Sequence, residues 1–150
     1  MNCTHCDHTN KSVIYKSKYW TIVLHKQDYL ARCVVDLNRH VNNFARLSNE
    51  EVIELRDLLG KYEVMLKDLF GCTMLNWCCN MNNAYGEGRD AHVHIHVRPR
   101  YKNSVTIKDI TYVDKEFGAH YDRKAPVQFN QDTQDFIYKK LAENASKYLN

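Results

Sequence analysis

The sequence has no long apolar run and only a small excess of charge. No stretch approaches the roughly 20 apolar residues that a membrane-spanning helix needs, so we expect no membrane association. The first residues are polar and contain no apolar segment of the kind found in secretion signals. The formal net charge is +3, which is too small to predict binding to nucleic acid. We therefore expect a cytoplasmic protein, with a charge balance compatible with a small anionic ligand.

Internal repeats, low-complexity tracts and interdomain linkers are also absent from the 150 residues. A chain of this length is typical of one domain and can bury a core without disulfides, so we expect a single domain over residues 1–150. In the cytoplasm the six cysteines should be thiols or metal ligands. Cys3 and Cys6 have the spacing of a metal-binding pair, whereas the other four lie in apolar segments that favour core packing.

The hydrophobic pattern predicts short strands around one long helix. Ser48 and Glu51 form a capping-box pattern, and an amphipathic helix should follow over residues 49–69. Glycine and asparagine predict a loop over residues 82–90, and a last helix is expected over residues 131–149. Strands are expected at residues 12–16, 19–25, 32–37, 73–81 and 91–98. This order predicts an α+β fold on an antiparallel sheet of about five strands, with one long helix and a C-terminal helix.

Three histidines alternate with apolar residues in the last predicted strand. Successive side chains of a strand point to opposite faces, so His92, His94 and His96 should share one face. A neutral imidazole is a good nucleophile near pH 7 when its second nitrogen carries the proton. Such a nucleophile splits one displacement into two steps through a covalent intermediate. The same side chains could instead bind a metal ion or be solvated, and spacing alone does not separate these alternatives.

The segment that begins at His92 resembles the signature of the histidine-triad (HIT) superfamily, in which three histidines alternate with apolar residues and Pro-Arg-Tyr often follows. The apolar strand that ends near His40 and the helix after Ser48 also resemble parts of this family. The N-terminal Cys-x-x-Cys is similar to that of the zinc-bearing branch. The resemblance covers residues 3–101 and implies a HIT-like core, with residues 102–150 as a C-terminal extension.

The resemblance also implies an activity, that of a nucleotide hydrolase or transferase similar to the diadenosine polyphosphate hydrolases. His94 would attack the α-phosphorus of a purine nucleotide conjugate and form a nucleotidyl-histidine intermediate. His96 would orient the strand and the nucleophile by hydrogen bonding to the backbone, while His92 completes the triad. The conjugate would be a dinucleoside polyphosphate, such as diadenosine tetraphosphate, or a nucleoside phosphoramidate. The family further implies a homodimer.

The turn before the triad departs from the family pattern. Asn82 resembles an asparagine that contacts ribose or phosphate, but Asn80 and Asn83 lie close by and leave the assignment open. The family turn usually reads Gly-Gln followed by Ser or Thr, whereas Gly88 and Arg89 stand here in a shorter turn. Arg89 would replace the glutamine as a phosphate ligand. The unusual turn keeps a second hypothesis open, a zinc- and nucleotide-binding module without catalysis.

The resemblance assigns a zinc site as well. In the zinc-bearing branch, the Cys-x-x-Cys pair is joined by the histidine that ends the third strand and by the first triad histidine. The implied ligands here are Cys3, Cys6, His40 and His92. Four protein ligands leave no open position on a tetrahedral ion, so the zinc should be structural. His5 and His8 are nearby competitors for the same ion.

Overall fold

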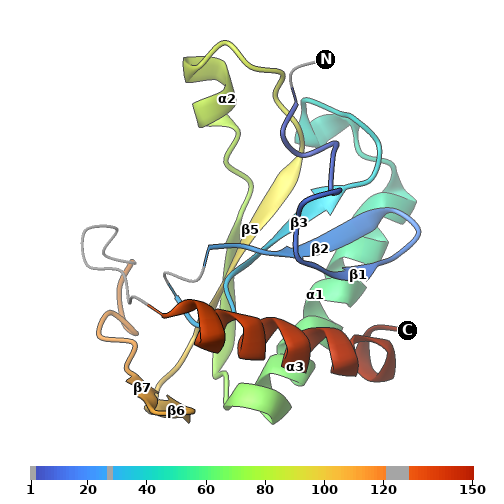
Figure 1. The fold of residues 1–150 in the computed structure, drawn as a ribbon. Helices are drawn as coiled ribbons and strands as arrows, with labels where there is room; N and C mark the ends of the chain where they lie inside the picture. Colours follow the sequence, from blue (N-terminus) through green and yellow to red (C-terminus); the bar gives the residue numbers. More distant parts are fainter. Residues whose placement is uncertain (1–2, 27–28, 121–128) are drawn as a thin grey trace.

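A five-stranded antiparallel sheet forms the centre of the molecule (Figure 1). The computed structural model describes residues 3–26, 29–120 and 129–150. The sheet has the strand order β1-β2-β3-β5-β4, and every neighbouring pair is antiparallel. Its strands are β1 (Val13–Lys16), β2 (Trp20–Leu24), β3 (Cys33–Leu37), β4 (Met74–Cys78) and β5 (His94–Arg100). With helices α1 and α3 described below, this sheet confirms the predicted α+β fold.

The long helix α1 (Asn49–Phe70) begins and ends as its sequence predicts. The Ser48 hydroxyl accepts from the backbone N–H of Glu51, whose carboxylate accepts in return from the Ser48 N–H, so the capping box is formed. Gly71 ends the helix in the left-handed conformation, with a φ of 70°, where glycine carries no steric penalty. The face of α1 toward the sheet is apolar and includes Leu55, Leu59, Tyr62 and Leu66.

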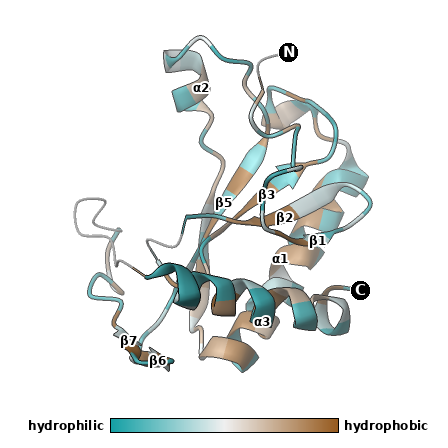
Figure 2. Cartoon of the chain, viewed as in Figure 1, coloured by the Kyte–Doolittle hydropathy of each residue, from teal (hydrophilic) through white to brown (hydrophobic). Residues whose placement is uncertain are grey.

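The C-terminal helix α3 (Gln131–Leu149) contacts α1 and β1 (Figure 1). The Asn130 side chain caps it by accepting from the Thr133 backbone N–H at 2.9 Å. Its buried residues Ile137 and Leu141 belong to the same core cluster as Ile95 of β5. Figure 2 shows hydrophilic colour over much of the remaining surface of α3. None of the described helices is both long and apolar enough to cross a membrane.

The segment before the triad differs from the sequence prediction. Residues 82–86 form a short helix, α2 (Asn82–Gly86), where a loop was expected, because local backbone hydrogen bonds such as Glu87 N–H to the Asn83 carbonyl close helical turns. The predicted strand 73–81 is shorter, and ends at Cys78. Strand β5 starts at His94 rather than at residue 91, because the Val93 N–H donates to the Val41 carbonyl instead of a sheet neighbour.

Residues 102–120 gave no clear sequence pattern and contain a small hairpin, β6 (Val105–Ile107) and β7 (Ile110–Tyr112). Tyr112 packs edge-on against Tyr101, with ring centroids 5.5 Å apart, and lies 5.9 Å from the ring of Phe129. These buried aromatic rings connect the C-terminal part of the chain to the end of β5.

Candidate active site and metal centre

Strand β5 places His94 and His96 on the face of the sheet opposite the helices. Ile95, between them, is fully buried in the core with α1 and α3. His92 lies just before the strand begins. All three histidine side chains line one cavity of about 330 Å³, as the alternation of the sequence predicts. Figure 1 shows that the N-terminal segment and α2 lie at this end of the sheet, where β5 begins.

His94 is held in one defined tautomer. Its Nδ1 lies 2.7 Å from the backbone carbonyl oxygen of His92. A carbonyl only accepts, so Nδ1 carries the hydrogen and Nε2 keeps its lone pair. The residue is 6% exposed, and its burial lowers its pKa below the ordinary histidine value. His94 is therefore a neutral imidazole with an unprotonated Nε2 at neutral pH.

His96 contacts His94 through the Nε2 atoms of the two rings. The two Nε2 atoms are 3.2 Å apart, and the rings are nearly perpendicular. Because the Nε2 atom of His94 is the acceptor, His96 donates through its own Nε2–H. Burial, followed by the neighbouring His94, lowers the pKa of His96 to about 3. The backbone hydrogen bond expected of His96 is made by His94 instead, since no described residue partners His96 Nδ1.

A buried carboxylate that the sequence analysis did not single out lies beside the triad. Asp36 of β3 is 1% exposed and pairs in register with His94 of β5. Its Oδ1 accepts from His5 Nδ1 at 2.7 Å and its Oδ2 from His8 Nε2 at 2.9 Å, with Lys11 Nζ at 3.7 Å. Burial raises the pKa of Asp36, but these hydrogen bonds and charges outweigh it and hold the pKa below its ordinary value. The sequence does carry one indication of a role for Asp36, because it is an acidic residue inside an otherwise apolar strand.

His5 lies flat against His94. The rings of His5 and His94 have centroids 3.9 Å apart and planes inclined by only 12°. His5 is a competing metal ligand by sequence, but it does not belong to the cluster of metal-binding atoms found among the described residues. Its ring donates to Asp36 and lines the same cavity as the triad.

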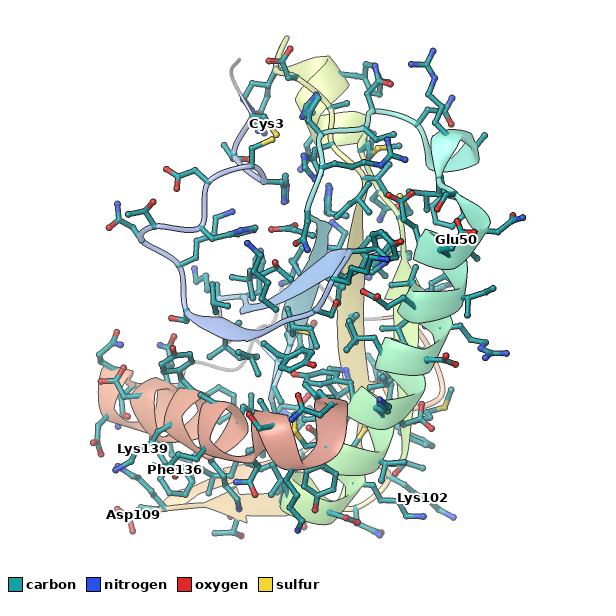
Figure 3. The ribbon with its side chains drawn as sticks, turned by 90° about the vertical axis from the view of Figure 1, so that its right-hand side faces the viewer. Cys3, Glu50, Lys102, Asp109, Phe136 and Lys139 are labelled. Carbon is teal, nitrogen blue, oxygen red and sulfur yellow. The ribbon has the colours of Figure 1, made fainter. Side chains whose placement is uncertain are left out.

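The four expected zinc ligands do lie together. One nitrogen or sulfur atom from each of Cys3, Cys6, His40 and His92 lies within 4.8 Å of the others. His92 Nδ1 is 3.4 Å from Cys3 Sγ and 3.3 Å from Cys6 Sγ, and His40 Nδ1 is 3.3 Å from Cys6 Sγ. In tetrahedral zinc sites the bond lengths place nitrogen and sulfur ligands about 3.5 Å apart. The donor atoms therefore fit a tetrahedral zinc ion. Cys3, one of the four, lies on the N-terminal segment (Figure 3).

The backbone orients His92 toward this metal site. Its Nε2 donates to the Leu37 carbonyl at 2.8 Å, which leaves Nδ1 free to face the two sulfur atoms. Hydrogen bonds of this kind commonly fix the tautomer of a metal-binding histidine. Burial lowers the pKa of His92 to about 4, so the ring is neutral and able to bind a metal at pH 7.

Of the residues that the sequence assigns to substrate binding, some line the triad cavity and Gly88 does not. The cavity that contains the triad is also lined by Asn80, Asn82, Asn83 and Arg89. Arg89 pairs with Glu87 at 2.6 Å and donates to Thr4 at 3.3 Å, so it also connects the turn to the N-terminal segment. Gly88 has a φ of 64° and shapes the turn, but it is not among the residues that line the cavity. All three candidate asparagines are therefore near the triad.

Solved structures with the same fold are histidine-triad proteins. A hypothetical histidine triad nucleotide-binding protein from Sulfolobus tokodaii matches with a TM-score of 0.68 and 17% identity, over 97% of this chain and 93% of that one. A zinc-bound histidine triad family protein from Mycobacterium smegmatis matches with a TM-score of 0.60 and 15% identity, over 93% and 89% of the two chains. Diadenosine triphosphate hydrolase from Plasmodium falciparum matches with a TM-score of 0.60 and 16% identity, over 93% of this chain and 80% of that one. No protein-family model and no curated protein matches the sequence.

Proposed function

We propose that this chain, which has the fold of histidine-triad proteins, is a nucleotide hydrolase or transferase with His94 as its nucleophile. One observation carries the proposal: the hydrogen bond from His94 Nδ1 to the His92 carbonyl keeps Nε2 unprotonated, so its lone pair, which accepts from His96, can turn to a phosphorus atom in the cavity. A nucleophilic histidine needs this tautomer. The adjacent Nε2–H of His96 supplies a donor for a phosphate oxygen or a leaving group.

The reaction proceeds in two displacements. His94 Nε2 attacks the α-phosphorus and forms a nitrogen–phosphorus bond, while the bond from phosphorus to the leaving group breaks and its electron pair departs with that group. The His92 carbonyl, which accepts from Nδ1, stabilises the positive charge that the ring gains. Water, phosphate or another acceptor then attacks the phosphorus, releases the nucleotide and restores neutral His94.

The substrate that we propose is a purine nucleotide conjugate, either a dinucleoside polyphosphate or a nucleoside phosphoramidate. A cavity of about 330 Å³ is at the lower end of the range for small-molecule pockets, which suits one nucleotide unit. Arg32 and Arg89 line it and supply positive charge for phosphate oxygens, and the asparagines of the turn supply amide donors. One solved structure of the same fold is a diadenosine triphosphate hydrolase.

We propose a structural zinc ion held by Cys3, Cys6, His40 and His92. Four protein ligands leave no position for substrate, so the zinc would supply no chemistry to the reaction and would fix the fold locally. It would connect the N-terminal segment to His92, which lies two residues before the start of β5. The zinc ion would in this way hold His92 in place, and the carbonyl of His92 sets the tautomer of His94.

We also propose a homodimer formed through β4, which is an edge strand of the sheet, and the adjacent face of α1. An apolar groove of about 480 Å³ lies there, lined in part by Phe44, Val52, Leu59 and Trp77. Trp77 is 56% exposed, an unusual exposure for a tryptophan on an unpaired strand edge. We expect the protein in the cytoplasm, where its six free cysteines remain reduced.

Turnover of a panel of adenosine conjugates by the wild type and by His94→Ala tests the function. The wild type should release a nucleoside phosphate, and His94→Ala should lose at least about 10³-fold in kcat while remaining folded. His120→Ala is the matched control, because His120 is an exposed histidine that does not line the triad cavity. Nucleotide binding without any release would instead support the non-catalytic module, and undiminished turnover by His94→Ala would exclude the mechanism.

A further inference from the structure

The imidazole of His5 covers one face of the His94 ring. The two centroids are 3.9 Å apart and the planes are nearly parallel, at 12°, which is direct face-to-face contact. His5 reaches this place from the N-terminal segment, far from β5 in sequence. It lies between Cys3 and Cys6, so the segment that supplies two metal ligands also places a flat ring on the nucleophile.

A buried carboxylate holds His5 in this position. Asp36 accepts from His5 Nδ1 at 2.7 Å and, through its other oxygen, from His8 Nε2 at 2.9 Å. Asp36 is 1% exposed and lies opposite His94 in the register of β3 and β5. The His5 ring is therefore fixed from two directions, by a charge-assisted hydrogen bond along its edge and by the His94 ring against its face.

The orientation of the His94 ring matters for its attack on phosphorus. The lone pair of Nε2 lies in the plane of the ring, so the plane determines the direction of attack. In the described structure hydrogen bonds hold the ring at Nδ1, to the His92 carbonyl, and at Nε2, from His96. Once phosphorus takes the place of His96 at Nε2, only the Nδ1 bond remains, and the ring can tilt about it. A flat ring packed against its face opposes that tilt.

Resting on the proposed function, we propose that His5, anchored by Asp36, is a positioning residue that holds the plane of the His94 imidazole for attack on the α-phosphorus. His5 acts through its shape and not through a proton. Its contribution should appear in kcat for formation of the covalent intermediate and leave KM nearly unchanged. His8 shares Asp36 but makes no ring contact with His94 among the described residues, which makes it the natural control.

The test compares His5→Ala, His5→Phe and His8→Ala in the zinc-containing protein. His5→Ala should lower kcat by about 10-fold or more, because misplacing a reacting group by about 1 Å costs up to ~10²-fold. His5→Phe keeps a flat ring but loses the hydrogen bond to Asp36, so it should restore part of the kcat that His5→Ala loses. His8→Ala should change kcat by less than about 3-fold. Equal losses in His5→Ala and His5→Phe, or no loss in His5→Ala, would overturn the proposal.

A second readout does not depend on turnover. A ring stacked on His94 shifts the NMR signals of the His94 ring protons, so we expect this shift in the wild type and in His5→Phe but not in His5→Ala. If the shift follows this pattern and the wild type hydrolyses nothing, the proposed function fails while the packing stands. If the wild type is active but His5→Ala matches it in both readouts, only the positioning role fails.

Discussion

The carbonyl oxygen of His92 accepts a hydrogen bond from His94 Nδ1 at 2.7 Å, while the ring of His92 faces the sulfur atoms of Cys3 and Cys6. The backbone of His92 thus contacts the proposed nucleophile, and its side chain belongs to the proposed metal site. Any shift of His92 would move the acceptor that sets the tautomer of His94. The two sites are coupled by the geometry of one residue.

Loss of the proposed metal ion should therefore reduce the stability of the fold. Cys6→Ser removes one of four ligand atoms and should lower zinc content well below one ion per chain. We expect the melting temperature to fall by about 6 °C, the change that about 2 kcal/mol causes in a domain of this size. Elemental analysis and thermal unfolding measure the two effects. Cys79→Ser, outside the metal set, is the control, and near-stoichiometric zinc in Cys6→Ser would contradict the site.

The buried ion pair between Arg100 and Asp114 should stabilise the C-terminal part of the chain. Arg100 Nε lies 2.7 Å from Asp114 Oδ2, both side chains are almost fully buried, and Arg100 also donates to the carbonyls of Glu116 and Ala119. Asp114→Ala leaves a buried guanidinium without its counter-charge and should cost about 3–5 kcal/mol in urea unfolding. The solvent-exposed Asp57, which pairs with a neighbouring arginine, provides the control in Asp57→Ala. Equal stabilities of the two variants would refute this role.

The capping box of α1 should make stability depend on pH. Hydrogen bonds from Arg39 lower the pKa of Glu51, against a smaller effect of burial, and the Ser48 N–H lowers it further. A lowered folded-state pKa means that Glu51 stabilises the fold above about pH 4.5 and loses this effect as the pH falls through the folded value. Glu51→Gln should therefore cost about 1 kcal/mol at pH 7. The difference in unfolding free energy from the wild type should narrow below pH 4.5, and a constant difference would contradict this assignment.

The proposed homodimer has a direct test at Trp77. Trp77→Lys puts a charge into the exposed apolar groove beside β4 and should shift the protein toward monomers. Light scattering after size-exclusion chromatography measures the mass of each species. Tyr85→Lys is the control, because Tyr85 is 66% exposed on α2 and does not line this groove. A wild type that elutes as a monomer, or a Trp77→Lys dimer as stable as the wild type, would exclude this interface.

Much of the fold could be read from the sequence because the local signals were strong. Ser48 and Glu51 correctly predict the start of α1, which runs to Phe70, one residue beyond the predicted end. The errors fall where local composition and long-range pairing disagree. The asparagines and glycines of residues 82–90 suggested a loop, yet α2 closes its own hydrogen bonds. The start of β5 depends on Val41, a partner that alternation within residues 91–98 could not reveal.

The candidate site was only partly predictable for the same reason. The spacing of His92, His94 and His96 indicated a shared cavity, and the structure brings them to one. The roles of His5 and Asp36 depend on a contact between distant segments, which neither residue type nor spacing encodes. The backbone bond expected of His96 is made by His94, and His96 Nε2 instead lies 3.2 Å from His94 Nε2, a side-chain contact that spacing does not specify.

A covalent bond between His94 and a nucleotide can be detected by mass spectrometry after rapid quenching in denaturant at neutral to alkaline pH, where a nitrogen–phosphorus bond survives. The wild type would be mixed with a dinucleoside polyphosphate, quenched within one turnover and weighed intact, with His94→Asn treated in parallel. We predict an adduct of one nucleotidyl group per chain, carried by the peptide that contains His94 and absent from the variant. Turnover by the wild type without any adduct, or the same adduct on His94→Asn, would exclude a covalent intermediate on His94.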